Sequence, residues 1–280
     1  MTNTPPTVDS AQLTRILASR PREVVELVRQ RLADLRACVM FDCTRVNKTP
    51  LRGSVLDRLL GRVEPSFLLQ PTASKFGGLP YVEKADEHLD GRFVGQINFA
   101  EVTDALRSSG AAISADMPTK GLLALDLLNP FWTGRVRWYA DPRPDKSVPP
   151  ARTEWVAKYE AKPTFRGSWS LRGLEFFDGI DDDHELWEFM NNLDLPGIDE
   201  DAHSGHKLFG HANEVLNEHY GFTPVPGRSD SIRDYRLVWR INFDNAAGFA
   251  WGTNWLYVII HKDDLAAGAL EKALLTGANA

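Results

Sequence analysis

The chain has 280 residues, of which 43% are hydrophobic and 25% charged, and its formal net charge is −6. This length and composition are typical of a globular protein that folds as one large domain or as two closely joined halves. No apolar run is long enough to span a bilayer, and the opening MTNTPPTVDSAQ lacks the basic start and apolar stretch of a secretory signal. These features argue against a membrane protein and predict a cytoplasmic one.

Two cysteines are present, Cys38 and Cys43. Two thiols without further cysteines are too few for a thiolate metal site of the usual ligand count. Catalytic redox pairs favour the tighter C-x-x-C spacing. We therefore expect reduced thiols that are at least partly buried, with a redox pair as the alternative.

The N-terminal part of the chain predicts two helices followed by a strand. Apolar residues recur with helical spacing between positions 24 and 35, and Pro21 suits a first turn, so we expect a helix from about Pro21 to Arg36. A shorter helix should precede it at about residues 10–18. The segments that follow predict a strand at 38–46, a short helix at 54–61 and an extended segment at 66–71.

Five later segments are short, apolar or alternating, and bounded by turn residues, which is typical of strands. They are residues 92–99, 121–128, 135–141, 235–243 and 255–261. Two more helices are predicted, one with an acidic start at 182–192 and a final one at 262–277 that ends at Gly277. The Pro-rich stretch DPRPDKSVPPAR at 141–152 is the best candidate for a boundary between two halves.

Two pairs of similar stretches suggest an internal duplication. FGGLPYV from Phe76 has a counterpart in FGHANEV from Phe209, and FVGQINF from Phe93 matches LVWRINF from Leu237, at separations of 133 and 144 residues. A true duplication predicts pseudo-repeats at about 61–140 and 153–280 within one compact α+β body over 61–280. An N-terminal helical segment and first strand over residues 1–60 would precede this body. Two chance matches are the alternative.

Charge is distributed unevenly along the chain. Residues 175–201 contain eleven acidic residues and no Lys or Arg, whereas residues 1–70 contain eleven Lys or Arg against seven Asp or Glu. An acidic segment repels phosphate, which argues against nucleic-acid binding there, and it attracts basic protein surfaces. A solvated acidic loop is the alternative. The residues predicted to bind a basic partner are Asp178, Asp181, Asp182, Asp183, Glu185, Asp199, Glu200 and Asp201.

The stretch HSGHKLFGH at 203–211 carries three histidines around two glycines. His203, His206 and His211 would bind zinc, with Asp201 as a fourth ligand, if the loop brought the three imidazoles together. Their spacing differs from H-E-x-x-H, and the glycines argue against a helix that would align two of them. We therefore favour packed or hydrogen-bonded histidines and predict no metal or cofactor.

No catalytic residue is predicted. Ser229 and Ser231 lie in GRSDS, which lacks the G-x-S-x-G turn of a nucleophile elbow. The stretch SKFGGLP is too short for a P-loop, so we expect Gly77 and Gly78 to allow positive φ or close chain packing. The acidic run at 181–183 lacks the residue order of an EF-hand loop, which argues against calcium.

Five stretches carry a family likeness: SKFGGLPYV, GRFVGQINFAEV, GHKLFGHANEV, YRLVWRINFD and NWLYVIIHKDDLAAGALEKAL. In this order, over about residues 60–276, they resemble the YwqG-like family, bacterial proteins grouped as a domain of unknown function (DUF1963). The resemblance implies an α+β fold with mixed or antiparallel β-sheets and peripheral helices, in a cytoplasmic bacterial protein without established catalytic residues. The sequence departs from the family pattern at two turns, where VEKADEHLDGR and WGTN stand, so no ligand role is carried over to them.

Families of this kind also occur beside secreted-toxin genes, which makes a neutralising role a natural hypothesis. We therefore expect a cytoplasmic, non-catalytic protein-binding module, an immunity-type inhibitor that meets a basic toxin or effector through its acidic residues. The alternative is a metal-dependent or small-molecule enzyme that uses the loop with His203, His206 and His211. Neither nucleic acid nor a membrane is expected as a partner.

Overall fold

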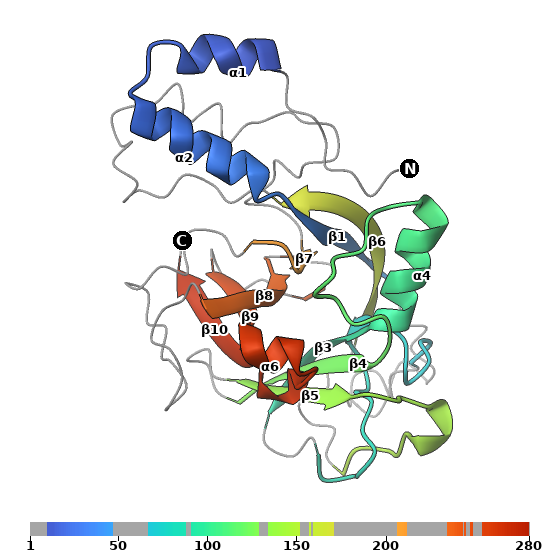
Figure 1. Ribbon diagram of the computed structural model, residues 1–280. Coiled ribbons are helices and arrows are strands. Elements are labelled where there is room, and N and C mark those ends of the chain that lie inside the picture. The colour runs from blue at the N-terminus through green and yellow to red at the C-terminus, as the bar shows by residue number, and fades with distance from the viewer. Residues whose placement is uncertain are drawn as a thin grey trace.

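The computed structural model describes residues 10–46, 67–87, 91–128, 134–151, 157, 159–170, 206–211, 234–242, 244, 247–248 and 254–279. In these ranges the chain forms one ten-stranded sheet with α-helices around it (Figure 1). The predicted α+β architecture, with antiparallel strands and peripheral helices, is confirmed. None of the helices in these ranges has the length and apolar composition needed to cross a membrane. The helices predicted at 54–61 and 182–192 lie outside the described residues.

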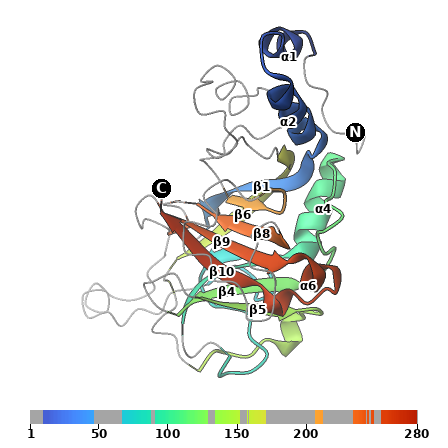
Figure 2. The same ribbon diagram turned by 60° about the vertical axis from the view of Figure 1, so that its left-hand side comes forward.

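Two helices begin the described chain. α1 spans Ser10–Leu17 and α2 spans Arg22–Ala33, close to the predicted ranges. α2 starts directly after Pro21, whose φ of −54° already suits a helix and whose missing N–H would have no helical partner there. The two helices lie together at one end of the sheet in both ribbon views (Figure 1, Figure 2).

A helix that the sequence analysis does not predict, α4, spans Phe99–Ser109. Asn98 caps it by accepting a hydrogen bond from the Ala100 amide at 3.0 Å, and Gly110 ends it with a left-handed φ of 67°. Its buried residues are Phe99, Val102, Thr103 and Leu106. This spacing of three and four residues places them on one helix face, which covers the sheet.

The predicted C-terminal helix over 262–277 is wrong beyond its first turns. α6 spans only Lys262–Ala266, and Gly268 follows with a left-handed φ of 71° that ends the helix. The apolar residues farther on form β10, Leu274–Asn279, which pairs with its neighbouring strand in the sheet. Strand pairing thus overrides the helical spacing of these apolar residues.

Every strand pairing in the sheet is antiparallel. The sequence predicts six of the strands: β1 (Arg36–Arg45), β3 (Arg92–Asn98), β4 (Leu122–Leu127), β5 (Gly134–Tyr139), β8 (Tyr235–Ile241) and β9 (Asn254–His261). It does not predict the other four: β2 (Lys75–Gly77), β6 (Glu160–Ser170), β7 (His206–Leu208) and β10 (Leu274–Asn279). β2 and β7 are too short to show alternation, and β6 contains Pro163 and Gly167, residue types depleted in strands.

The strand order is β10-β9-β8-β7-β1-β6-β2-β3-β4-β5. β1 and β6 form the middle of the sheet and pair along the whole length of β1. β2-β3-β4-β5 continues the sheet beside β6, whereas β7-β8-β9-β10 continues it beside β1. The later strands of the first half, β2–β5, thus extend the sheet from β6, the first strand of the second half. The later strands of the second half, β7–β10, extend it from β1, the first strand of the first half. β1, which the sequence analysis groups with residues 1–60, lies at the centre of this arrangement.

The two halves share a pairing irregularity. β3 and β4 shift register between Phe93 and Gly95, and β8 and β9 shift register between Leu237 and Trp239. These are the positions that the sequence comparison aligns, FVG with LVW. A β-bulge bends its strand locally, so both halves bend at the same place.

The short strands β2 and β7 can also be matched between the two halves. Their structural match differs by one residue from the alignment predicted from the sequence. The equivalent cross-strand pairs are Lys75–Gln96 and Lys207–Arg240. In this register Phe209 takes the place of Gly77, and the two residues share a left-handed backbone, with φ of 57° and 67°. The sequence comparison instead aligns Phe209 with Phe76. The expectation of positive φ at Gly77 and Gly78 is confirmed.

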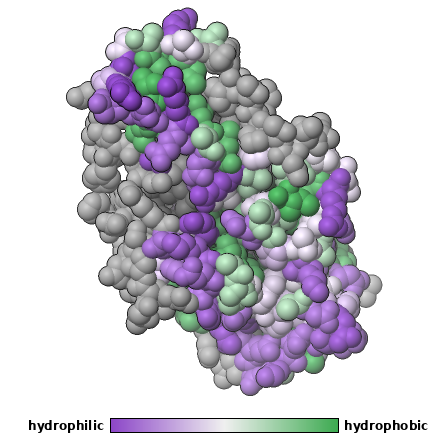
Figure 3. Space-filling view, in the orientation of Figure 1, coloured by the Kyte–Doolittle hydropathy of each residue, from purple (hydrophilic) through white to green (hydrophobic). Residues whose placement is uncertain are grey.

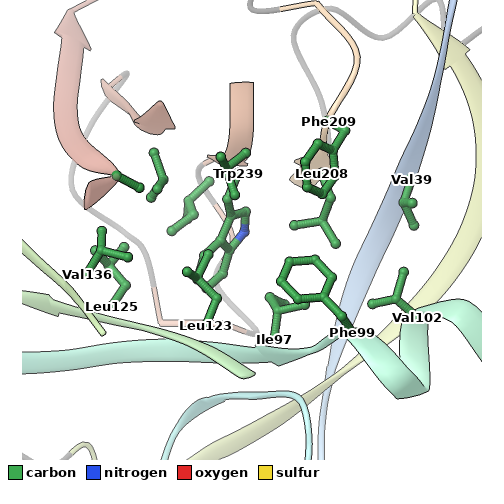
Figure 4. Packing of buried hydrophobic residues seen from close by; sticks show 14 of the residues in the cluster. Val39, Ile97, Phe99, Val102, Leu123, Leu125, Val136, Leu208, Phe209 and Trp239 are labelled. Atoms are coloured by element: carbon green, nitrogen blue, oxygen red, sulfur yellow. The ribbon is translucent and has the colours of Figure 1, made fainter. Parts of the chain in front are cut away.

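The sheet curls until its two edge strands meet (Figure 2). A Cβ placed on Gly134 of β5 would lie 2.3 Å from Leu275 Cδ2 of β10, so the edges are in direct contact. One hydrophobic cluster drawn from both halves fills the curl (Figure 4), and its members include Val39, Ile97, Phe99, Leu123, Leu208, Phe209 and Trp239. Truncation of the fully buried Trp239 to Ala should cost about 3–5 kcal/mol of stability.

Hydrophilic side chains cover much of the described surface on the face drawn in Figure 3. Among the described residues, the exposed large hydrophobic side chains are Leu68 and Leu128. Single exposed apolar residues are normal on protein surfaces. They do not mark an apolar docking surface.

Candidate functional site

The predicted partner-binding residues lie outside the part of the chain that the structure describes. This set comprises Asp178, Asp181, Asp182, Asp183, Glu185, Asp199, Glu200 and Asp201, all within residues 171–205. His203 falls in the same range, and Ser229 and Ser231 fall in another such range. Their roles stay predictions from the sequence.

The other two histidines of the loop point to different places. His206 lies opposite Phe41 in the pairing of β7 with β1, and it stacks between Phe41 and Phe76 inside the curled sheet, with ring centroids 5.0 Å and 4.9 Å apart. His211 instead approaches Asp34, at the far end of β1. Seven residues of extended chain between positions 34 and 41 correspond to roughly 20 Å. His206 and His211 therefore do not converge on one metal ion.

His211 has a structural role. Its Nε2 lies 2.6 Å from the backbone oxygen of Asp34, so the ring donates a hydrogen bond that joins the end of β7 to the connection between α2 and β1. Burial lowers the pKa of His211 to about 4, although the Asp34 contacts work in the opposite direction. The ring is therefore neutral at physiological pH. The expectation of a hydrogen-bonded histidine holds for this residue.

His206 belongs to a different group, the Cys43–His206–Asp244 cluster. One side-chain ligand atom from each of these three residues lies within 4.8 Å of the other two. Cys43 follows Phe41 by two residues on β1, so both side chains are on the same face of the sheet as His206. Asp244 comes shortly after the end of β8, the strand that pairs with β7. Three adjacent strands thus bring together residues that are far apart in the sequence.

Hydrogen bonds fix the proton of His206. Its Nδ1 accepts from the Asn242 amide at 3.3 Å, so the proton of the neutral ring is on Nε2. Nε2 then donates to Asp244 Oδ2 at 3.1 Å, while Asp244 Oδ1 accepts from the Ala247 amide at 3.2 Å. The His206 side chain is 1% exposed and that of Asp244 is 21% exposed, so Asp244 lies on the solvent side of the cluster.

The Cys43 thiol is not an activated nucleophile. Burial raises its pKa strongly, and the negative charges of Asp244 and Asp42 raise it further. The thiolate is therefore scarce at neutral pH, and nucleophilic chemistry through Cys43 is disfavoured. Cys38 and Cys43 are not joined in a disulfide, and their odd spacing on β1 places them on opposite faces of the sheet, which argues against a redox pair.

A second buried polar group, Lys75 with Glu160, anchors the segment before β2. Glu160 Oε2 accepts hydrogen bonds from the Leu68 and Leu69 amides at 2.6 Å and 3.1 Å. Lys75 Nζ lies 3.9 Å from Glu160 Oε1 and donates to the Gln70 backbone oxygen at 3.3 Å. Burial lowers the pKa of Lys75 to about 8 against the opposing effect of Glu160. These contacts hold the backbone of residues 68–70 in place, so Lys75 and Glu160 have a structural role.

A third polar group, on β4 and β5, secures the segment over residues 81–87. Arg137 donates two hydrogen bonds to Asp126, at 2.6 Å and 3.1 Å, and another to the Tyr81 backbone oxygen. Tyr139 donates to Glu87 at 2.6 Å. Burial alone would lower the pKa of Arg137, but Asp126 and Tyr139 together raise it. Arg137 and Asp126 thus form a buried ion pair with a structural role.

Sequence reasoning did not find Cys43 and Asp244 as members of a site with His206. Each of the three residues comes from a separate segment, at positions 43, 206 and 244, and no short motif joins them. A local signal exists only for His206, through its histidine-rich loop. Strand order, which places β1, β7 and β8 side by side, is the information that assembles the cluster.

Comparison with known proteins gives one family. A family model described as "Domain of unknown function (DUF1963)" matches residues 74–277, well over half of the chain. The matched range includes His206 and Asp244 but not Cys43 on β1. No curated protein matches the chain.

Proposed function

Since this chain belongs to the DUF1963 family, whose function is unknown, we propose from its own residues that it is a cytoplasmic, non-catalytic protein-binding module. Its partner is a basic protein, and the role is that of an immunity-type inhibitor of a basic toxin or effector. The observation that carries this proposal is the segment 175–201, with eleven acidic residues and no Lys or Arg. Such a charge imbalance attracts cationic surfaces and speeds their encounter.

Three arginines of the N-terminal third have contacts with other described residues. Arg22 pairs with Glu26 on α2, and Arg36 pairs with Asp34 at the start of β1. Arg45 lies over the ring of Tyr159, with its Cζ 4.9 Å from the ring centroid.

The described polar side chains support a binding role over catalysis. Cys43 is a neutral thiol, and the ammonium of Lys75 is held beside Glu160. His206 already uses one ring nitrogen for the Asn242 amide and the other for Asp244. Within the described part of the chain, no nucleophile with an adjacent free base is present.

Charge reversal tests the binding proposal. The tagged protein and its Asp181→Lys/Asp182→Lys/Asp183→Lys variant are used to capture partners from lysate of the native host at low and at moderate salt. We expect the wild-type chain to retain a basic protein and the variant to lose it. The matched control reverses three exposed acidic residues elsewhere, Asp86, Asp104 and Asp116. Equal capture by the two triple variants would contradict the proposal.

The alternative is a metal-dependent or small-molecule enzyme that uses the loop of His203, His206 and His211, and the positions of His206 and His211 do not favour its metal version. His206 faces the interior of the sheet, whereas His211 is engaged at the other end of β1. A three-histidine centre predicts bound metal that is lost on His211→Ala, so metal analysis of this variant separates the metal version from the binding proposal.

We also propose that the two halves are copies of one YwqG-like unit that exchange their first strands. The mirrored strand order, the bulges at matching positions and the shared left-handed backbone of Gly77 and Phe209 support this. The proposal predicts that family members align half against half with the offset of 144 residues that relates Phe93 to Leu237. A family-wide alignment without any such internal similarity would contradict it.

A further inference from the structure

We propose that the Cys43–His206–Asp244 cluster binds a divalent cation of the borderline-soft class, such as Zn²⁺, in a site with three protein ligands and an open fourth position. The ligand atoms are the Cys43 sulfur, His206 Nε2 and a carboxylate oxygen of Asp244. Binding displaces the Cys43 proton to solvent, and thiolate, imidazole and carboxylate together suit Zn²⁺ better than Mg²⁺ or Ca²⁺, which prefer oxygen ligands alone. This inference is independent of the acidic segment.

The fold supplies the positions of the three ligands. β1 and β7 are paired so that Phe41 lies opposite His206, which places the next inward residue of β1, Cys43, beside the histidine. The ring of His206 is held between Phe41 and Phe76, so its direction toward Asp244 is fixed by packing. A ligand held rigidly on strands loses little freedom when it binds an ion.

The distances are close to those of a coordination sphere. Zinc bonds of about 2.0–2.3 Å place tetrahedral ligand atoms about 3.3–3.8 Å apart. The pair His206 Nε2 and Asp244 Oδ2 is already at 3.1 Å, and all three ligand atoms lie within 4.8 Å of one another. A shift of about 1 Å in the Cys43 side chain would complete the geometry.

The electrostatics of the cluster also favour a cation. Asp244 is a ligand, and its carboxylate lies within 4.8 Å of the Cys43 sulfur and the His206 ring nitrogen. A carboxylate at this position attracts a divalent ion. Asp244 is partly exposed while His206 is buried, so the ion would enter from the solvent side, where the fourth position would take water.

The other half of the sheet shows that the fold does not require these residue types. Ser74 occupies the position equivalent to His206, and its Oγ accepts a hydrogen bond from the Asn98 amide at 2.8 Å, just as His206 Nδ1 accepts from Asn242. A hydroxyl is therefore sufficient for the structural contact. The imidazole Nε2, with the thiol and carboxylate around it, is additional to what the strand pairing needs.

Metal binding has one structural consequence. A cation on Nε2 moves the ring proton to Nδ1, where it faces the Asn242 amide, so the 3.3 Å contact between Asn242 and His206 must open. Asn242 follows the last paired residue of β8, Ile241, so this change leaves the β8–β9 pairing intact. The lost hydrogen bond weakens binding, and we expect a site of moderate affinity.

Cobalt titration tests the proposal. The full chain, freed of its purification tag and treated with chelator, is titrated with Co²⁺ under reducing conditions. We expect one Co²⁺ per chain, visible d–d bands and a near-ultraviolet sulfur-to-cobalt charge-transfer band that a thiolate ligand produces. Cys43→Ser should abolish the charge-transfer band, and His206→Ser and Asp244→Asn should each weaken binding at least tenfold.

The variants keep the test independent of folding. His206→Ser copies Ser74 and retains an acceptor for the Asn242 amide, and Cys43→Ser is nearly isosteric. Cys38→Ser, on the opposite face of β1, is the matched cysteine control and should keep the band. Absence of cobalt binding by folded wild-type protein, or a charge-transfer band that survives Cys43→Ser, would overturn the proposal.

Discussion

Ser74 and His206 perform the same task at equivalent positions of the two halves of the sheet. Ser74 Oγ accepts a hydrogen bond from the Asn98 amide, and His206 Nδ1 accepts one from the Asn242 amide. Asn98 is the last residue of β3, and Asn242 directly follows the last residue of β8. One structural requirement is thus met by two side chains of different chemistry, and only one of them can also bind a cation.

This equivalence predicts that His206→Ser is milder than His206→Ala. Alanine removes both the acceptor for the Asn242 amide and the ring between Phe41 and Phe76, so we expect a loss of about 2–4 kcal/mol in the free energy of unfolding. Serine restores the acceptor and should recover about 1 kcal/mol of that loss. Urea unfolding of the metal-free variants measures the difference. Equal losses of stability in His206→Ala and His206→Ser would show that the hydrogen bond from the Asn242 amide does not stabilise the fold.

The left-handed glycines provide a second prediction. Gly78→Ala should cost more stability than Gly268→Ala, although both residues have positive φ, 66° and 71°. A Cβ on Gly78 would lie 2.5 Å from Glu160 Cγ, whereas a Cβ on Gly268 meets nothing within 4 Å. We expect about 1 kcal/mol for Gly268→Ala from backbone strain and at least about 2 kcal/mol for Gly78→Ala.

Thermal or urea unfolding of the two variants checks this expectation. The difference isolates the clash with Glu160, whose carboxylate holds the Leu68 and Leu69 amides. If both variants lose the same stability, the Glu160 side chain moves away freely and does not secure that segment.

The sequence predicts six of the strands because their pattern is local. β1, β3, β4, β5, β8 and β9 each carry a continuous or alternating apolar run that one window of sequence contains. β2 and β7 consist of three residues each, and they are defined by their neighbours alone. The segment with Leu274 and Leu275 has helical spacing but forms β10 because β9 offers an edge to pair with.

The proposed duplication illustrates a different difficulty. Aligning Phe76 with Phe209 maximises identity, but the backbone conformation makes Phe209 the equivalent of Gly77. A buried Phe in a left-handed conformation contradicts the usual preference for Gly, so sequence rules reject the correct register. Cross-strand pairing is the information that identifies it.

The candidate metal site is even less accessible to sequence reasoning. His206 was noticed because His203 and His211 are near it in the chain, yet its neighbours in space are Cys43 and Asp244. The pairing of β1 with β7 and of β7 with β8 is what joins these three segments. Long-range strand pairing is not encoded in any local motif.

The buried pair of Arg137 and Asp126 provides a third prediction. Asp126→Ala leaves the guanidinium of Arg137 buried without its carboxylate, so we expect a loss of about 3–5 kcal/mol. Asp141→Ala, which removes a carboxylate that pairs with Arg143 at the surface, should change stability by about 0.5 kcal/mol or less. Urea unfolding compares the two carboxylate deletions directly.

A double variant that removes both charges of this buried pair gives a further test. Asp126→Ala with Arg137→Met removes both charges, so it should be less destabilised than Asp126→Ala alone. A double variant that is less stable than Asp126→Ala would contradict this expectation. Arg137 would then stabilise the protein mainly through its hydrogen bond to the Tyr81 backbone oxygen.

A fourth prediction concerns pH and His211. Burial lowers the pKa of folded His211 to about 4, whereas the unfolded chain has a histidine pKa of about 6.5. The unfolded state therefore binds the proton first as the pH falls. The stability that His211 contributes is present above pH of about 6.5 and is lost as the pH falls to about 4, to an extent of the order of 2–3 kcal/mol.

Unfolding with urea at a series of pH values measures this loss, and His211→Gln provides the comparison. Glutamine still donates to the Asp34 backbone oxygen but does not titrate, so the variant should lose less stability than wild type between neutral pH and pH of about 4. Other groups titrate equally in both proteins, because the substitution leaves them unchanged. A wild-type profile that parallels the His211→Gln profile would show that the folded ring accepts a proton as readily as the unfolded one, and that the contact with Asp34 does not depend on a neutral imidazole.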